Sequence, residues 1–160
     1  MEYGMSRRIA VWLLCAACTV VAGISGSWFV ADLAANGWTA PDFAPPAWLF
    51  GPVWTVLYLM IATSGYFLIF AKPHDLKPVA LGLWSLQMCL NTLWTPVFFG
   101  AFDLWGAFHV IVALWCAIGA FVWVSFRVER RASLLFLPYW AWVSFASALN
   151  YGYILANPAT

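Results

Sequence analysis

Aromatic and amide side chains at helical spacing are the groups in this sequence that could act on another molecule. Trp54 and Tyr58 are four residues apart, so an α-helix places both rings on one face. Such rings offer flat apolar surfaces, and amides beside them supply hydrogen bonds. This combination suits the binding of a flat apolar molecule. It does not supply the acid, base or nucleophile pairs of ordinary hydrolytic or transfer enzymes.

A polar stripe marks one of the apolar segments. Gln87, Asn91 and Thr95 are spaced by four residues, and Trp94 lies beside them. Amides in an apolar helix need partners, so the stripe is predicted to face the interior of a helix bundle. Two interpretations of Asn91 stay open. It forms hydrogen bonds between helices and nothing more, or it also lines a ligand cavity.

A second stripe lies near the C-terminus. Its members recur at spacings of three and four, and they are Tyr139, Trp142, Ala146, Asn150 and Tyr153. Ala146 stands between an indole and an amide, so its methyl group leaves a depression that a larger side chain would fill. We expect this stripe to form a second wall of the same site.

The loop before Trp54 is predicted to cover that site. The segment 32–47 is the longest connection in the chain, and it carries Trp38 and Phe43. Pro46 presets the backbone for the first turn of a helix that begins near Trp48. We therefore expect a stiff aromatic lid joined directly to the helix of Trp54.

Composition predicts that the solvent of this protein is lipid. Of its 160 residues, 65% are hydrophobic and 8% are charged, whereas soluble domains are about 25% charged. Five uncharged runs each exceed the ~20 residues that cross a bilayer, and they are residues 9–31, 48–71, 79–102, 104–126 and 132–155. The expected fold is a single all-α integral membrane domain over residues 1–160, built as a five-transmembrane-helix bundle.

The distribution of charge predicts the topology. All Lys and Arg residues fall in the N-terminal segment and in the connections after the second and fourth runs, and they are Arg7, Arg8, Lys72, Lys77, Arg127, Arg130 and Arg131. The opposite connections carry Asp32, Asp42 and Asp103 without a cation. The positive-inside rule then places the N-terminus in the cytoplasm and the C-terminus outside, and a bacterial inner membrane is favoured. Three short cation clusters do not make the basic face of a nucleic-acid-binding protein.

Metal and cofactor sites are not expected. His109 is the histidine of the fourth run, and His74 is predicted on the opposite side of the membrane, which excludes axial haem ligation by two histidines. The four cysteines lie within predicted helices, where packing is their usual role. We assign no metal site and no obligatory cofactor.

Three separated motifs resemble the TspO/MBR family, which comprises the tryptophan-rich sensory proteins and the translocator protein, or peripheral benzodiazepine receptor. They are P-x-F-x-P-P-x-W-x-F-G-P-V-W-x-x-L-Y at 41–58, L-N-x-x-W-x-P-x-F-F-G at 90–100 and L-P-Y-x-x-W-x-x-F-A-x-x-L-N at 137–150. The motifs occur in order, and together they span residues 41–150, which is most of the chain.

The resemblance implies a five-helix bundle, commonly a homodimer, with a pocket closed by the first loop. Its implied ligands are porphyrins and sterol-like or isoquinoline-carboxamide molecules. Trp54 and Trp142 match the family's pocket tryptophans, Asn91 matches its amide and Ala146 matches its small pocket position. The family also includes members assigned to an outer membrane.

Two departures from the family pattern stand out. Asp42 follows Pro41 where the lid usually reads Lys-Pro, so cationic help for a ligand carboxylate is not expected there. No basic residue follows Tyr151 or Tyr153, so the sterol-recognition pattern is incomplete.

The expected function is a membrane receptor or sensor that binds porphyrins and other flat apolar ligands and regulates tetrapyrrole-linked or stress responses. Two alternatives are light-dependent porphyrin degradation, in which Trp54 and Trp142 would donate electrons, and transport of tetrapyrrole or sterol-like ligands. Expected partners are these small molecules, membrane lipid and a second copy of the chain, with the first and third helices as the first choice for the dimer face. The residues predicted to contact the ligand are Trp38, Phe43, Trp54, Tyr58, Gln87, Asn91, Trp94, Trp142, Ala146 and Asn150.

Overall fold

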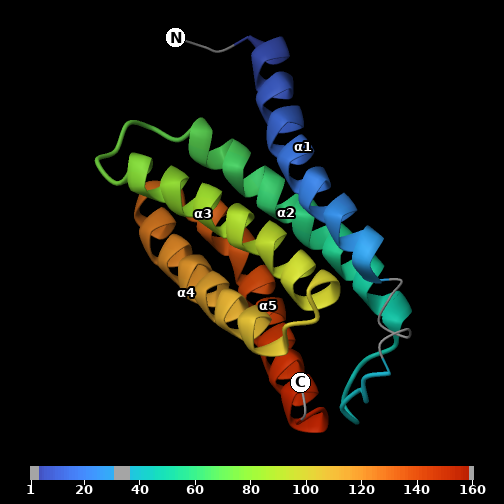
Figure 1. Ribbon diagram of the computed structural model, residues 1–160. Helices are drawn as coiled ribbons and strands as arrows, with labels where there is room; N and C mark the ends of the chain where they lie inside the picture. Colours follow the sequence, from blue (N-terminus) through green and yellow to red (C-terminus); the bar gives the residue numbers. More distant parts are fainter. Residues whose placement is uncertain (1–3, 31–36, 159–160) are drawn as a thin grey trace.

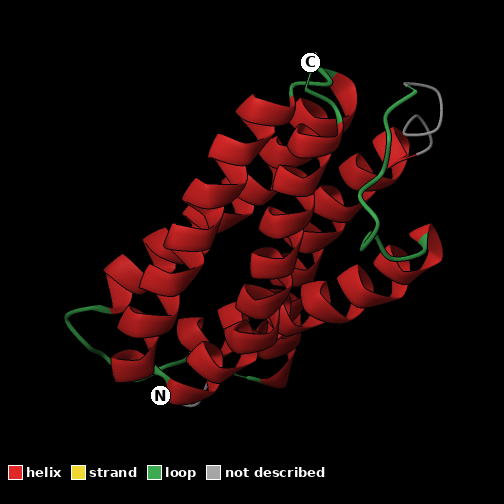
Figure 2. Ribbon diagram, turned by 90° about the horizontal axis from the view of Figure 1, so that it is seen from below, coloured by secondary structure: helices red, strands yellow, loops and turns green. Residues whose placement is uncertain are grey.

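The described residues form five long helices, and Figures 1 and 2 show how these helices pack side by side. The computed structural model describes residues 4–30 and 37–158, with only the backbone described for residues 21–30. The helices are α1 (Met5–Val30), α2 (Phe50–Ile69), α3 (Lys77–Thr95), α4 (Leu104–Val128) and α5 (Arg130–Ala156). Over the described residues the chain forms helices and loops and no strand.

Proline shapes the start of α2. Pro46 is extended, with φ −55° and ψ 139°, and a 3₁₀ turn η1 (Ala47–Leu49) follows it and leads into α2. Proline suits this place because the first turn of a helix needs no backbone N–H from it.

The end of α3 differs from the sequence expectation. The apolar run continues to residue 102, but α3 ends at Thr95 and a π-helical turn, η2 (Pro96–Gly100), replaces its last turn. Pro96 has no N–H to continue the helical ladder, and the wider turn is closed by the bond from Ala101 N to Pro96 O at 2.8 Å. Asp103 then caps α4 by accepting a hydrogen bond from Gly106 N.

The helices form a closed ring of neighbours. Each of the pairs α1–α2, α2–α5, α5–α4, α4–α3 and α3–α1 is in contact, and α2 also touches α3. Buried apolar side chains from α2 to α5 fill the centre, with Ile61, Phe121, Phe136 and Tyr139 fully enclosed. Residues of the N-terminal and C-terminal halves are therefore brought together inside one ring.

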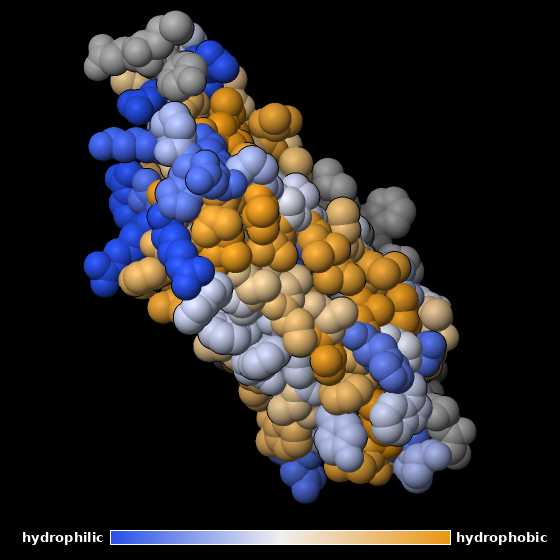
Figure 3. Space-filling model, turned by 90° about the vertical axis from the view of Figure 1, so that its left-hand side faces the viewer, coloured by the Kyte–Doolittle hydropathy of each residue, from blue (hydrophilic) through white to orange (hydrophobic). Residues whose placement is uncertain are grey.

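Three helical segments are long and apolar enough to cross a membrane, namely Ala47–Ile69, Leu104–Val128 and Arg130–Ala156. Large apolar side chains remain exposed on the outer surface, among them Trp48 and Trp123, and Figure 3 shows a wide apolar band along the molecule. A helix bundle that leaves such a surface uncovered needs lipid around it. Within the described residues α1 and α3 are not in this set, and α3 is 19 residues long and carries the polar stripe of Gln87 and Asn91.

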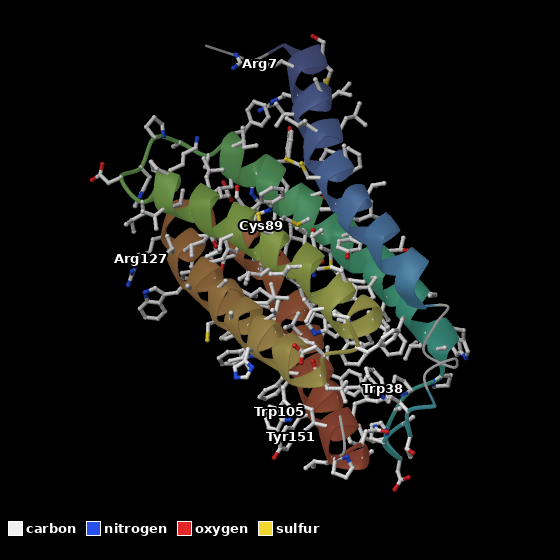
Figure 4. The ribbon with its side chains drawn as sticks, viewed as in Figure 1. Arg7, Trp38, Cys89, Trp105, Arg127 and Tyr151 are labelled. Carbon is white, nitrogen blue, oxygen red and sulfur yellow. The ribbon has the colours of Figure 1, made fainter. Side chains whose placement is uncertain are left out.

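The cations gather at one end of the bundle. Figure 3 shows hydrophilic residues concentrated there, and Figure 4 places Arg7 and Arg127 far from Trp38 and Tyr151 at the other end. Lys77 has a structural task at this end, because its Nζ donates to the carbonyls of Ile69 and Ala71, both at 2.8 Å. These bonds satisfy carbonyl groups at the C-terminal end of α2.

Candidate functional site

Asn91 is the polar hub of the bundle interior. Tyr58 Oη on α2 donates to Asn91 Oδ1 at 3.0 Å, and Asn91 Nδ2 donates to Tyr139 Oη on α5 at 2.9 Å. Asn91 and Tyr139 are buried. One amide on α3 thus joins three helices, and interhelical hydrogen bonding explains part of its presence.

Trp54 forms a wall beside this hub. Its ring lies 5.2 Å from that of Tyr58 with an angle of 30° between the planes, and 6.2 Å from Tyr139 in an edge-to-face arrangement. Both geometries are favourable for aromatic pairs. The interior between α2, α3 and α5 therefore presents aromatic faces around a small set of hydroxyl and amide groups.

Two polar atoms of this interior have no hydrogen-bond partner among the described residues. They are Trp142 Nε1, a donor on α5, and Gln87 Oε1, an acceptor on α3. Gln87 is fully enclosed and its Nε2 donates to the carbonyl of Trp84 in its own helix at 2.8 Å. Trp142 packs against Phe50 at 5.8 Å between ring centroids, and Ala146 is buried one turn further along α5. A buried polar atom without a partner costs about 1–3 kcal/mol, so each calls for an explanation.

Trp94 and Asn150 form a second polar link nearer the end of the bundle. Trp94 Nε1 donates to Asn150 Oδ1 at 3.3 Å, and Asn150 Nδ2 donates to the carbonyl of Leu104 at 3.0 Å. The amide is buried, and both its oxygen and its nitrogen form a hydrogen bond. It joins α3 and α5 to the start of α4.

The described part of the lid, residues 37–47, lies against the end of α5. Trp38 packs on Phe98, Phe102 and Tyr153, with ring centroids 5.7, 5.7 and 6.2 Å away. Its indole thus closes the bundle end above the link between Trp94 and Asn150, and Figure 4 shows it at this end. The remainder of the expected lid, residues 32–36, lies outside the described residues.

A latch holds the lid to α5. Asn157, which follows α5, accepts from Thr39 N at 2.9 Å and donates to Thr39 O at 3.0 Å. Five residues earlier, Gly152 has no side chain, and a Cβ there would lie 2.9 Å from Phe43 Cζ and 3.1 Å from Pro41 Cβ. Because Gly152 has no side chain, Pro41 and Phe43 can pack directly against α5 at this position.

Two open grooves lie on the outer faces of the bundle, away from this interior. One of about 400 Å³ lies between α4 and α5 and includes Trp115 and Tyr151 in its lining. The other, of about 500 Å³, lies between α1 and α3 and includes Cys18 and Cys89. None of the ten residues predicted to contact a ligand lines either groove.

Comparison with known proteins identifies the family. The model of the TspO/MBR family matches residues 9–155. The chain belongs to the TspO/MBR family. It is 35% identical to the protein CrtK of Rhodobacter capsulatus over 93% of this chain and 92% of that protein. It is also 35% identical to the tryptophan-rich protein TspO of Chlorobaculum tepidum, over 96% and 100%, and 34% identical to the human translocator protein, over 72% and 69%.

Membership of the TspO/MBR family fits the apolar outer surface, and this chain is an integral membrane protein. The residues that its sequence singles out fall into two layers of the structure. Trp54, Tyr58 and Asn91 meet in the interior, and Trp38 and Phe43 lie at the bundle end near α5. The other five predicted residues belong to the same two layers, and they are Gln87, Trp94, Trp142, Ala146 and Asn150.

Three further residues belong to this candidate site, although the sequence does not mark them as ligand contacts. Tyr139 is part of the C-terminal stripe predicted from the sequence, and the structure adds that its hydroxyl accepts the hydrogen bond from Asn91. Gly152 and Asn157 lie outside the sequence predictions and join the site through their contacts with the lid. A glycine directly between two tyrosines, at a position where the helix faces the lid, was the available signal for Gly152, whereas no local pattern marks Asn157.

Proposed function

We propose that this protein is a membrane receptor that binds a porphyrin, or another flat apolar molecule with polar edges, between α2, α3 and α5. The observation that carries the proposal is the buried indole N–H of Trp142, which has no partner among the described residues. A carboxylate or carbonyl oxygen of a ligand would accept its hydrogen bond. The surrounding aromatic faces suit the flat part of such a ligand.

Gln87 supplies the complementary group. Its Oε1 accepts nothing among the described residues, so it can receive an N–H donor such as a pyrrole nitrogen that carries hydrogen. Together the two atoms offer a donor and an acceptor in an otherwise apolar interior, which favours a ligand with both kinds of group.

Entry of such a ligand requires the aromatic side chains to part and the lid to move. Asn91 is hydrogen-bonded to both Tyr58 and Tyr139, and Asn157 is hydrogen-bonded to Thr39 of the lid. We propose that ligand binding is transmitted as a change in the lid and at the end of α5, which would couple occupancy to tetrapyrrole-linked or stress responses.

The proposal includes the arrangement in the membrane. We infer that all five helices span the bilayer, with the cation-rich end in the cytoplasm and the lid outside, as the positive-inside rule requires. The groove between α1 and α3 is the face that we propose for a homodimer. A bacterial inner membrane is the proposed location.

The proposal is tested by titration with protoporphyrin in the dark, followed by quenching of tryptophan fluorescence in detergent. The native protein is expected to show saturable quenching. Ala146→Phe is expected to weaken binding at least tenfold, because Ala146 is buried beside Trp142 and a phenyl ring there takes the space of the ligand.

The control is Ala148→Phe, on the exposed face of the same helix. It adds the same ring to the groove between α4 and α5, and it is expected to leave binding unchanged. Equal quenching of the native protein and Ala146→Phe, or a loss confined to Ala148→Phe, would place the porphyrin on the outer surface and contradict the proposal.

A further inference from the structure

Two arginines at the corner between α4 and α5 are held on exposed aromatic rings. The guanidinium carbon of Arg127 lies 4.8 Å from the ring centroid of Trp123, and that of Arg130 lies 4.9 Å from Phe126. Trp123 is 66% exposed and Phe126 is 48% exposed. Figure 4 shows Arg127 pointing away from the bundle. Stacking on a ring limits the motion of a guanidinium while leaving its N–H groups free to donate.

The nearby carboxylate does not neutralise these two arginines. Glu129 lies between them in sequence, but it accepts from Arg131 Nε at 2.9 Å and from Arg131 Nη2 at 3.3 Å. The hydrogen bond from Arg131 lowers the pKa of the Glu129 carboxyl, so Glu129 stays ionised and paired with Arg131. Arg131 itself also lies over Phe67 of α2.

This whole end of the molecule has a strong excess of positive charge. Its described residues carry all seven Lys and Arg side chains, against the acids Asp75 and Glu129. Within the part of the chain that the structure describes, the pair of Glu129 and Arg131 is the ion pair found. Arg127 and Arg130 are thus cations that lack an acidic partner among the described residues.

An apolar strip runs along α4 from the corner toward the middle of the bundle. Cys116, Ala120, Trp123 and Arg127 recur at spacings of four, three and four, so they share one face, and all four are exposed. Cys116 and Ala120 are small, exposed side chains that lie on this face about two turns and one turn before Trp123. The strip therefore changes from apolar to cationic at the height of Trp123.

We propose that this corner is a binding site for an anionic phospholipid, with Arg127 and Arg130 donating hydrogen bonds to the phosphate and an acyl chain lying along Cys116 and Ala120. The site is separate from the interior between α2, α3 and α5 and does not depend on the function proposed for it.

Both the charge and the neighbouring apolar side chains favour a lipid over a free phosphate ion. Guanidinium groups bind phosphate oxygens through paired N–H donors, and each basic residue near a membrane surface adds about 1 kcal/mol of attraction to anionic lipid. The exposed apolar face of α4 gives the acyl chain a contact that a soluble phosphate lacks. An exposed tryptophan at this height matches the boundary between headgroups and acyl chains.

The test measures lipid retention by native mass spectrometry of the purified protein in mixed micelles that contain phosphatidylglycerol or phosphatidylcholine. The native protein is expected to retain phosphatidylglycerol in preference. The double variant Arg127→Gln, Arg130→Gln is expected to lose about tenfold or more in apparent affinity for it, and Trp123→Gln, which keeps both cations, is expected to show a smaller loss.

The matched control is Arg7→Gln, Lys72→Gln, which removes two exposed cations from the same end and is expected to change affinity less than threefold. Unfolding temperatures measured in phosphatidylcholine micelles establish that each variant is folded. Equal losses in the two double variants, or equal retention of both lipids by the native protein, would overturn the proposal. If millimolar glycerol phosphate displaced phosphatidylglycerol as effectively as added lipid does, the proposal would also be overturned, because the site would then recognise free phosphate.

Discussion

Replacing Gly152 with valine is expected to speed the release of bound protoporphyrin about tenfold, which corresponds to roughly 1.4 kcal/mol. The reason is the close packing of the lid against α5 at Gly152. A Cβ at this position would lie 2.9 Å from Phe43 Cζ and 3.1 Å from two atoms of Pro41, and the rigid ring of Pro41 cannot turn aside. The lid must therefore lift from α5. The measurement is the dissociation rate by stopped-flow fluorescence after dilution or competition in the dark.

Gly82→Val provides the control for this prediction. Gly82 lies in α3, and a Cβ added there meets no atom within 4 Å. The control therefore makes the same glycine-to-valine change within a helix without contacting the lid, and we expect ligand release to keep the native rate. An unchanged rate in Gly152→Val would show that the lid does not govern release.

Asn91→Leu is expected to lower the free energy of unfolding by about 2–4 kcal/mol. The substitution removes the acceptor for Tyr58 Oη and the donor to Tyr139 Oη. Tyr139 is fully buried and Tyr58 is half-buried, so both hydroxyl groups lose a hydrogen-bond partner in the bundle. Each unsatisfied hydroxyl costs about 1–3 kcal/mol. Unfolding in detergent, followed by circular dichroism against temperature or denaturant, measures the loss.

A triple variant separates this effect from simple misfit of the leucine. Adding Tyr58→Phe and Tyr139→Phe to Asn91→Leu removes the hydroxyl groups that were left without partners, so stability is expected to recover by at least 1 kcal/mol. If the triple variant is no more stable than Asn91→Leu alone, the hydrogen-bonded hub is not the source of the loss. Thr92→Val, on the same helix with its hydroxyl bonded to the carbonyl of Met88, is expected to cost less than 1 kcal/mol.

Helical periodicity predicted which faces point inward, because a residue's direction in a helix follows from its spacing. Trp54 and Tyr58 do share a face, and Asn91 does meet residues of α2 and α5. Spacing cannot tell which side chains on different helices meet, since that depends on the order of helices around the ring. The bonds from Asn91 to two tyrosines, and from Trp94 to Asn150, became visible only in three dimensions.

Contacts between distant segments limited the rest of the prediction. Thr39 and Asn157 are separated by 118 residues, and neither belongs to a periodic pattern. The end of α3 was missed for a different reason, because the apolar run through Val97 and Phe98 continues past the point where Pro96 changes the backbone ladder. The hydrophobicity of a segment indicates that it lies in apolar surroundings, whereas the backbone geometry determines the residue at which its helix ends.

The central claim is that the ligand lies inside the bundle, between α2, α3 and α5. The most direct measurement is a crystal structure with zinc protoporphyrin, in which anomalous scattering from zinc marks the centre of the ring. The account predicts a single zinc peak among Trp54, Asn91 and Trp142. A peak in either outer groove, beside Trp115 or beside Cys89, would contradict it.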